Sequence, residues 1–249
     1  MKKSVTLIMF TIVLFISCNK SKEEPPYVCT SCTKTPQALA ANNSSSKGIY
    51  KGVVFGSTGT VLFDIQNNSI AVTAALILDG VTVSFSSGTL PQTGQPYTAA
   101  FTGTINGQSA SFNFSVQANG SSPAITSANI PGHPNVAISL LKETSVNLVE
   151  CFEGTSKGVT NNVPESGKFN LVLSRSAGTW SALTIDNRPN QYQYQYWNGT
   201  ISGNSLTCSC PPAIILTGTF SGDQINGQYS DNTPVTGGGS GTWTVRRTL

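Results

Sequence analysis

From residue 48 to the end of the chain, apolar and polar residues alternate in short runs. Residues 60–65 and 111–116 alternate strictly, which predicts strands with one face turned toward a core. Residues 71–78 are more continuously apolar, but the alternation beside them at 81–85 favours a hairpin over a helix. The sequence has no convincing long amphipathic helix. The pattern therefore predicts an all-β, antiparallel fold.

Turn-forming residues recur at short intervals between these runs. Asn, Asp and Gly tolerate the backbone angles that tight hairpin turns require. Several short strands separated in this way are typical of a small sandwich or barrel. The turn signals include Asp79-Gly80, Asn106-Gly107, Asn119-Gly120, residues 186–189 and Asn226-Gly227.

A short unit of the form apolar-x-Gly-Thr-apolar-x-Gly occurs three times, at residues 101–107, 197–203 and 216–222. On a strand, the large apolar side chains and the first glycine of this unit share one face. A glycine beside bulky groups lets a sheet bend tightly or another side chain pack over it. The unit therefore predicts the inward face of a small, coiled barrel, with the second glycine ending the strand in a turn.

A weak internal repeat divides the chain into two parts. Residues 49–52 (Ile-Tyr-Lys-Gly) match residues 151–154 (Cys-Phe-Glu-Gly) at an offset of 102 residues. This predicts two β domains, 47–145 and 146–249, each of about 100 residues, a common size for a small domain. The alternative is one larger β-structure with coincidental glycine spacing.

The N-terminus has the proportions of a secretory signal. Lys2 and Lys3 precede an apolar run over residues 5–16, which ends at Ser17-Cys18. The run is too short to span a bilayer, which takes about 20 residues. We expect residues 1–17 to be a signal peptide. An apolar helix that stays attached is the alternative.

The end of this run, Phe15-Ile16-Ser17-Cys18, resembles the lipobox of bacterial lipoproteins. The resemblance implies that Cys18 is acylated and becomes the new N-terminus, and it departs from the usual motif at Phe15, where many lipoboxes have Leu. Asn19 stands where an Asp would imply retention in the inner membrane, so the resemblance implies the outer membrane, on its periplasmic face or at the cell surface. The hairpins are similar to those of calycin-like barrels and of two-copy β lipoproteins of unknown role.

Residues 18–46 are expected to form a lipidated tether. They begin with charged residues, continue through Pro25 and Pro26, which prevent a helix, and end in a polar run at 43–46. The expected architecture is thus a flexible tether followed by two small barrel- or sandwich-like domains.

The composition argues against several classes of function. Charged residues make up 10% of the chain and the formal net charge is +3, which provides no basic face for a nucleic acid. His133 is the single histidine, whereas acid–base catalysis and zinc sites usually depend on this residue. A Gly-x-Ser-x-Gly motif at 154–158 lacks a following helix and a downstream histidine. We therefore expect a non-enzymatic protein without cofactor or metal.

Five cysteines remain after the lipidated one, and an exported chain meets oxidising conditions. We expect Cys29 to pair with Cys32, and Cys151 to pair with Cys208 or Cys210, although sequence cannot fix the connectivity. The alternative is a zinc site formed by the Cys29/Cys32 and Cys208/Cys210 pairs. The oxidising compartment and the tight Cys-x-Cys spacing argue against it.

A tyrosine-rich segment before Trp197 is the most specific candidate for a binding surface. If one strand runs through it, Tyr192, Tyr194 and Tyr196 share a face, opposite Trp197 and Ile201 in the core. Such a row can stack on sugar rings or on an apolar partner surface. The alternative is that the tyrosines turn inward or pack beneath the other domain.

Together these features predict an exported, lipid-anchored, non-enzymatic β protein of the outer envelope. Its partners would be the membrane, through the lipid on Cys18, and a glycan or an envelope protein, with no nucleic acid. The alternative is a structural or assembly lipoprotein that binds no small ligand.

Overall fold

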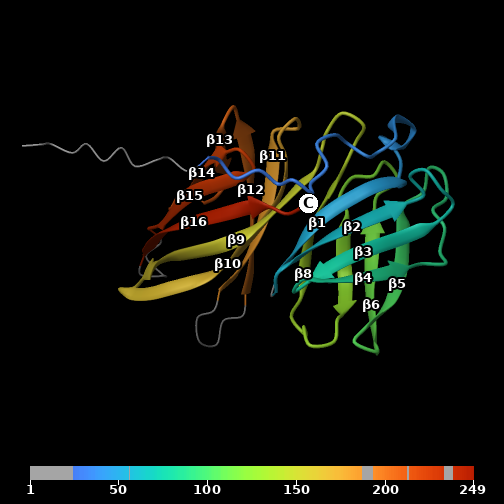
Figure 1. The fold of residues 1–249 in the computed structure, drawn as a ribbon, viewed down its shortest axis with the longest axis horizontal. Coiled ribbons are helices and arrows are strands. Elements are labelled where there is room, and N and C mark those ends of the chain that lie inside the picture. Colours follow the sequence, from blue (N-terminus) through green and yellow to red (C-terminus); the bar gives the residue numbers. More distant parts are fainter. Residues whose placement is uncertain (1–24, 56, 187–192, 212, 233–237) are drawn as a thin grey trace, which may run out of the picture.

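The computed structural model describes residues 25–55, 57–186, 193–211, 213–232 and 238–249. These contain one 3-10 turn, Ala40–Asn42, and sixteen strands in two antiparallel sheets that lie side by side (Figure 1). The predicted all-β, antiparallel class with two barrel-like units is therefore confirmed. In the described part of the chain, no helix has the length and apolar character needed to cross a membrane.

The first sheet has eight strands in the order β7-β6-β5-β4-β3-β2-β1-β8. Its edge strands β7 and β8 approach within 8 Å (Cα–Cα), so that the sheet curls into a barrel-like form. The strands are β1 (Gly48–Phe55), β2 (Gly59–Ile65), β3 (Val72–Leu78), β4 (Val81–Ser86), β5 (Tyr97–Ile105), β6 (Gln108–Val116), β7 (Ala124–Asn129) and β8 (Ala137–Lys142).

The second sheet is a closed eight-stranded barrel in which β9 pairs with both β10 and β16. All other neighbouring strands in this barrel are consecutive in sequence, as hairpin connections produce. The strands are β9 (Glu150–Thr160), β10 (Val163–Ser174), β11 (Thr179–Asp186), β12 (Gln193–Ser202), β13 (Ser205–Cys208), β14 (Ile214–Ser221), β15 (Gln224–Asp231) and β16 (Gly239–Arg247).

Aromatic side chains fill the interiors of both units. In the first, the Phe63 ring lies 5.1 Å from Phe101 and 4.8 Å from Phe114 between ring centroids. In the second, Phe169 packs on Trp243 at 4.8 Å, and both are buried. Rings at such distances fill the space between strands, and the pairs add about 0.5–1.5 kcal/mol each to the burial of apolar area.

The glycine units predicted from sequence lie where an aromatic ring crosses a strand. Each first glycine faces inward, directly opposite the ring of a residue on a neighbouring or next-neighbouring strand. An added Cβ would lie 2.9 Å from Cδ1 of Phe85 at Gly103, 2.5 Å from Nε1 of Trp180 at Gly199, and 2.5 Å from Cη2 of Trp243 at Gly218. The prediction that these glycines allow a bulky group to pack over them is confirmed.

The second glycine of each unit ends its strand, as predicted. Gly107, Gly203 and Gly222 have φ angles of +78°, +56° and +64°, which L side chains rarely adopt. The turn predicted at Asn226-Gly227 is wrong, because both residues lie within β15. Gly227 is instead another glycine that accommodates the Trp243 ring.

The two units contact each other through the outward faces of β1, β8, β9, β10 and β11. A small apolar cluster, which we call the seam, is buried between them and includes Val53, Val149, Cys151 and Val172. Polar bonds also cross it: Asn170 Nδ2 donates to Val54 O at 2.8 Å, and the hydroxyls of Ser139 and Ser181 are 3.0 Å apart.

Residues 25–46, the described part of the expected tether, lie along one side of both units (Figure 1). We call them the N-terminal segment. It contacts the second barrel through Tyr27 O, which accepts from Asp223 N at 2.8 Å. It reaches the first sheet through Leu39 N, which donates to Asn67 Oδ1 at 2.9 Å. The segment thus spans both units.

Candidate functional site

The two ends of the second barrel differ in chemistry. One end, which we call the closed end, carries the turn between β14 and β15 and the end of β16, and the N-terminal segment packs on it. Arg175 lies over the Phe220 ring there, with its guanidinium carbon 4.3 Å from the ring centroid. The opposite, open end carries the β9–β10 turn, the end of β15 and the start of β16.

A buried charge network occupies the closed end. Arg247, only 2% exposed, binds Glu150 at 3.1 Å, and Glu150 also binds Arg175 at 2.9 Å. Asp223 accepts from the Cys29 amide and from Lys34 Nζ, each at 2.8 Å. Each buried charge therefore has a partner, as stability requires. The network holds the N-terminal segment on the barrel.

The Asp223 carboxyl group is kept ionised by these contacts. Its partial burial acts to raise the pKa, but hydrogen bonds from Lys34 and from the Cys29 amide outweigh it, with the charges of Lys34 and Arg247. The net effect is a pKa below the ordinary value of 3.8. Asp223 is thus a structural anion and not a proton donor at neutral pH.

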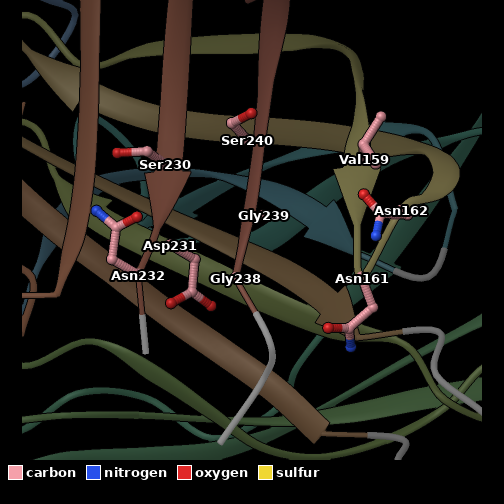
Figure 2. A pocket seen from close by; sticks show the side chains of 9 residues that line it. All are labelled: Val159, Asn161, Asn162, Ser230, Asp231, Asn232, Gly238, Gly239 and Ser240. Atoms are coloured by element: carbon pink, nitrogen blue, oxygen red, sulfur yellow. The ribbon is translucent and has the colours of Figure 1, made fainter. Parts of the chain in front are cut away.

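A cleft of about 430 Å³ opens at the other end of the barrel. Its side chains come from β15, β16 and the tip of the β9–β10 hairpin, as Figure 2 shows. Asn161 and Asn162, with φ angles of 52° and 62°, form the hairpin turn at its rim. The backbone N–H of Asn161 donates to Gly238 O at 3.2 Å. The lining residues are Val159, Asn161, Asn162, Ser230, Asp231, Asn232, Gly238, Gly239 and Ser240.

Strand register places three of these residues in one outward-facing row. Ser230 is opposite Ser240, and Ser240 is opposite Val159. The row continues on β14 with Ile215, which is opposite Ser230 and 56% exposed. Two hydroxyls thus lie between two exposed aliphatic side chains.

On the inner side of the same end, a tyrosine lies flat across two glycines. Tyr229 is opposite Gly241, which is opposite Gly158, which in turn is opposite Glu165. The Tyr229 hydroxyl reaches past both glycines and donates to Glu165 Oε1 at 2.6 Å. Burial, and then this hydrogen bond and the carboxylate charge, raise the pKa of Tyr229.

The predicted tyrosine row is only partly described. Tyr192 lies outside the described residues, and Tyr194 belongs to β12, but its side chain is not among those described. Tyr196 is 65% exposed, while Trp197 and Ile201 pack against the core of the second barrel. Between β12 and β15 the barrel order has β13 and β14, so Tyr196 does not line the cleft.

The cysteines pair locally. Cys29 adjoins Cys32 and Cys208 adjoins Cys210, with Cα–Cα distances of 5.5 and 5.2 Å. These distances lie within the range that a disulfide requires. The expected bridge from Cys151 is wrong: Cys151 points outward into the seam and donates to Gly52 O at 3.3 Å, whereas Cys208 packs against the barrel interior.

The chemical groups considered for metal binding or catalysis are spread over the molecule. Cys29 is at the closed end and Cys208 is at the end of β13 toward the open end, so the two pairs do not combine into one zinc site. Among the described residues, no three His, Cys, Asp or Glu side chains form a group that could hold a metal ion. His133 lies 3.6 Å from Asp79 in the first unit, far from the motif at 154–158, which is part of β9.

Sequence reasoning missed the cleft because its residues come from three separate strands. Ser230, Ser240 and Val159 carry no motif, and only the strand register brings them into one row. The paired asparagines at 161–162 were the available signal, since two residues with positive φ indicate a tight hairpin turn.

Comparison with known proteins gives limited information. No family model matches the chain, and neither does any curated protein. Among solved structures, a mutant of the vaccine antigen transferrin-binding protein B from Haemophilus parasuis shares 9% identity at a TM-score of 0.32, covering 86% of this chain and 77% of that chain. A protein of unknown function from the DUF3598 family of Nostoc punctiforme shares 10% at 0.26, covering 82% and 94%. Such values carry no functional argument.

Proposed function

We propose that this protein is an exported lipoprotein, acylated at Cys18 and held at the outer membrane, whose β body binds a glycan or an envelope partner without transforming it. The observation that carries the proposal is the filling of both barrels. Aromatic and aliphatic side chains pack the interior of the first unit and the described interior of the second barrel away from its open end, which leaves the exterior and the open end for recognition.

The chemistry of the exterior favours a polar, uncharged ligand. A row of outward residues on the second barrel is joined by strand register from β11 to β16; its members there are uncharged hydroxyl or amide residues, and it continues on β9 with Lys157. Hydroxyl and amide groups donate and accept hydrogen bonds without the desolvation cost of a charge. The row consists of Thr179, Thr200, Thr207, Thr217, Gln228 and Thr242.

The position of the N-terminal segment supports a particular orientation. Tyr27 lies at the closed end, where its hydroxyl donates to Arg247 O at 3.2 Å. An anchor on Cys18 would therefore hold the closed end toward the membrane and direct the open end away from it. A partner arriving from outside would meet the open end first.

Three acidic groups of the second barrel have structural partners, which supports the non-enzymatic part of the proposal. Glu150 and Asp223 are bound to Arg247 and Lys34 at the closed end, and Glu165 is bound to Tyr229 at the open end. An acid–base pair needs two such groups facing one substrate. The assay is incubation of the purified protein with polysaccharides, and we expect no release of reducing ends.

Labelled palmitate tests the anchor. The wild-type chain should incorporate the label, and Cys18→Ala should not, because the thiol is the acceptor. Protease treatment of intact cells then distinguishes the two faces of the outer membrane. An unmodified N-terminus in the mature wild-type protein would contradict the proposal.

Recognition is tested by two pull-down experiments on detergent extracts. Immobilised polysaccharides should retain the protein if it binds glycans, and Tyr196→Ala tests whether the exposed tyrosine contributes. Co-purification of an envelope protein without polysaccharide binding would favour the structural or assembly role instead.

A further inference from the structure

We propose that the folded body touches the membrane and that its contact surface, which we call the basal face, binds lipid headgroups. The basal face consists of the N-terminal segment, the closed end of the second barrel, the linker at residues 143–149 and the adjoining end of the first unit, with its turns at 66–71 and 87–96. This rests on the proposed function, in which Cys18 carries the anchor. It adds a second contact with the membrane, made by the protein body itself.

The length of chain between the anchor and the body limits how far the basal face can stand from the membrane. Seven residues, 18–24, precede Pro25, the first described residue of the N-terminal segment. Since an extended chain covers at most about 3.6 Å per residue, they reach about 25 Å. The second barrel is longer than this reach, because the 12 residues of β10 cover about 40 Å. The closed end is therefore held beside the lipid surface.

The basal face is continuous across the two units because the chain joins them at this end. β8 ends at Lys142 and β9 begins at Glu150, so the linker runs from the end of the first unit to the closed end of the second. Ser145 N donates to Asn43 Oδ1 at 2.9 Å, which ties the linker to the N-terminal segment. Figure 1 shows this segment, in blue, along the upper side of both units.

Three aliphatic residues are exposed on the part of the basal face that the first unit provides. Leu39, 46% exposed, lies on the N-terminal segment beside the 66–71 turn, in which Ile70 is 88% exposed. Leu90, 56% exposed, lies in the loop after β4, and the Ser87 amide of this loop donates to Val72 O at 3.1 Å, next to the same turn. Such side chains suit the boundary between headgroups and acyl chains.

Two valines extend this apolar character toward the second barrel. Val28 is 57% exposed on the N-terminal segment, one residue after Tyr27, which contacts the closed end. Val146 is 72% exposed in the linker. Exposed valines also occur at the ends that point away from the anchor, at Val81 and Val163, and these positions provide matched controls.

Charges at the closed end have their cations nearer to solvent than their anions. The side chains of Lys34 and Arg175 are 54% and 38% exposed, whereas those of their partners Asp223 and Glu150 are 12% and 6% exposed. A surface of this kind attracts the phosphates of anionic lipids, because the positive groups can reach them while the negative groups stay buried.

Arg246 adds an exposed cation beside an aromatic ring of the N-terminal segment. Its guanidinium carbon lies 5.1 Å from the centroid of the Tyr27 ring. Glu153, opposite Arg246 on β9, offsets part of this charge. Tyrosine and arginine side chains are both suited to the headgroup region, where one part of the side chain is apolar and the other is solvated.

Fluorescence of the acylated protein in vesicles tests the proposal. The full acylated chain, with one added cysteine, is labelled with a polarity-sensitive dye and reconstituted into vesicles of phosphatidylethanolamine and phosphatidylglycerol. Four native cysteines are paired and Cys151 is buried, so the added thiol takes the dye. Mass spectrometry confirms the acyl group on Cys18 before each measurement.

The label positions compare exposed aliphatic residues on the two sides of the molecule. Ile70→Cys and Val146→Cys carry the dye on the basal face, and Val81→Cys and Val163→Cys carry it on the opposite ends. Lipids with a nitroxide at the headgroup should quench the first two at least about twofold more than the controls, because interfacial side chains enter the headgroup region by about 5–10 Å.

Two sets of variants test the chemistry of the contact, with the dye at residue 146. Ile70→Asp/Leu90→Asp should lower its quenching to the level of the controls, whereas Val81→Asp should leave it unchanged. Arg246→Gln should reduce the quenching in vesicles with phosphatidylglycerol, whereas Lys168→Gln, at an exposed position of β10, should not. Circular dichroism checks that every variant folds.

The remaining outcomes separate this inference from the anchor on which it rests. Equal quenching at all four label positions in acylated protein would overturn the basal face while the anchor stands. A chain without an acyl group on Cys18 would overturn the anchor and the inference together. Labels on the basal face that stay unquenched in vesicles but are shielded in native envelope fragments would overturn the lipid contact in favour of a protein partner.

Discussion

At the scale of single residues, inward-facing glycines limit what the second barrel can contain. Gly218 lies beneath Trp243, which is 2% exposed and cannot move toward solvent. We expect Gly218→Ala to destabilise the protein by about 1–3 kcal/mol, the usual cost of overpacking a core. Equilibrium denaturation in urea measures it.

Gly167 is the matched control for this substitution. It faces the same interior, but an added Cβ would approach nothing closer than Ser156 Oγ at 3.7 Å. Gly167→Ala should leave stability unchanged or raise it slightly, since alanine reduces the entropy of the unfolded chain. Equal losses for the two variants would contradict the role assigned to the Trp243 ring.

A second residue-scale prediction concerns Lys51 and Glu143, whose side chains are fully buried and 2.7 Å apart. Glu143 also accepts hydrogen bonds from the amides of Gln37 and Val149. Lys51→Met should cost about 3–5 kcal/mol, because it leaves a buried carboxylate without its cation. Denaturant titration gives the value.

The double variant Lys51→Met/Glu143→Gln is expected to recover part of that loss. Glutamine removes the uncompensated charge and keeps an acceptor for one of the two amides, which bind different oxygens of Glu143. Lys168→Met, at an exposed position of β10, should change stability by less than about 0.5 kcal/mol. A double variant no more stable than Lys51→Met alone would argue against this account.

At the scale of elements, strands and turns were predictable because their signals are local. The hairpin of β3 and β4 follows from alternation beside Asp79-Gly80, and the glycine units marked three strand ends correctly. The turn predicted at Asn226-Gly227 was wrong because an Asn-Gly dipeptide is typical of tight turns, whereas here Gly227 lies inside β15 and leaves space for the Trp243 ring. The predicted disulfide of Cys151 was wrong because Cys151 lies on the outward face of β9, whereas Cys208 packs against the barrel interior.

The N-terminal segment could not be placed from sequence, because polar contacts with residues distant in the chain hold it. Asp223 and Glu143 bind it through its backbone amides at Cys29 and Gln37. No periodic pattern in residues 25–46 predicts such hydrogen bonds, and the composition of this segment is that of a loop. The cleft could not be predicted for the same reason, because its residues are distant in the chain and become neighbours only when the strands pair in the closed barrel.

The pH response of this segment provides a prediction at the element scale. The pKa of Asp223 is lowered in the folded protein, so its stabilising contribution is present above the ordinary value of 3.8 and is lost as the pH falls through the lowered value. The Cys29 amide should therefore lose protection from hydrogen exchange as the pH falls below 3.8, after correction for intrinsic rates.

Asp223→Asn mimics the protonated state and should show this weakened protection already at pH 5. Lys34, Arg175 and Arg247 would then lack a full anionic partner. Asp79→Asn is the control, because Asp79 also has a lowered pKa but binds Ser57 and Thr58 in the first unit. Unchanged protection of Cys29 in Asp223→Asn would contradict the role of this carboxylate.

At the scale of the whole molecule, the internal repeat marks equivalent positions. Gly52 and Gly154 both lie on the first strand of their sheets, opposite the last strand, and Tyr50 and Phe152 both point into the core. The repeat could not show how the two units meet. The seam consists of outward-facing residues, which an isolated barrel would expose to water. Their apolar side chains are buried only because the two units pack against each other.

The last prediction tests whether the seam joins the two units into one cooperative body. Val53, Val149 and Val172 are fully buried there, so neither unit should unfold without exposing apolar surface of the other. Calorimetry of the wild type should show one thermal transition. Val53→Asp places a carboxylate without a cation in the seam, at a cost of several kcal/mol, while its strand remains paired within the first sheet. We therefore expect two transitions. Val81→Asp, at a position 53% exposed on β4, should keep one. A single, merely lowered transition in Val53→Asp would mean that contacts other than the seam, such as the N-terminal segment, couple the two units.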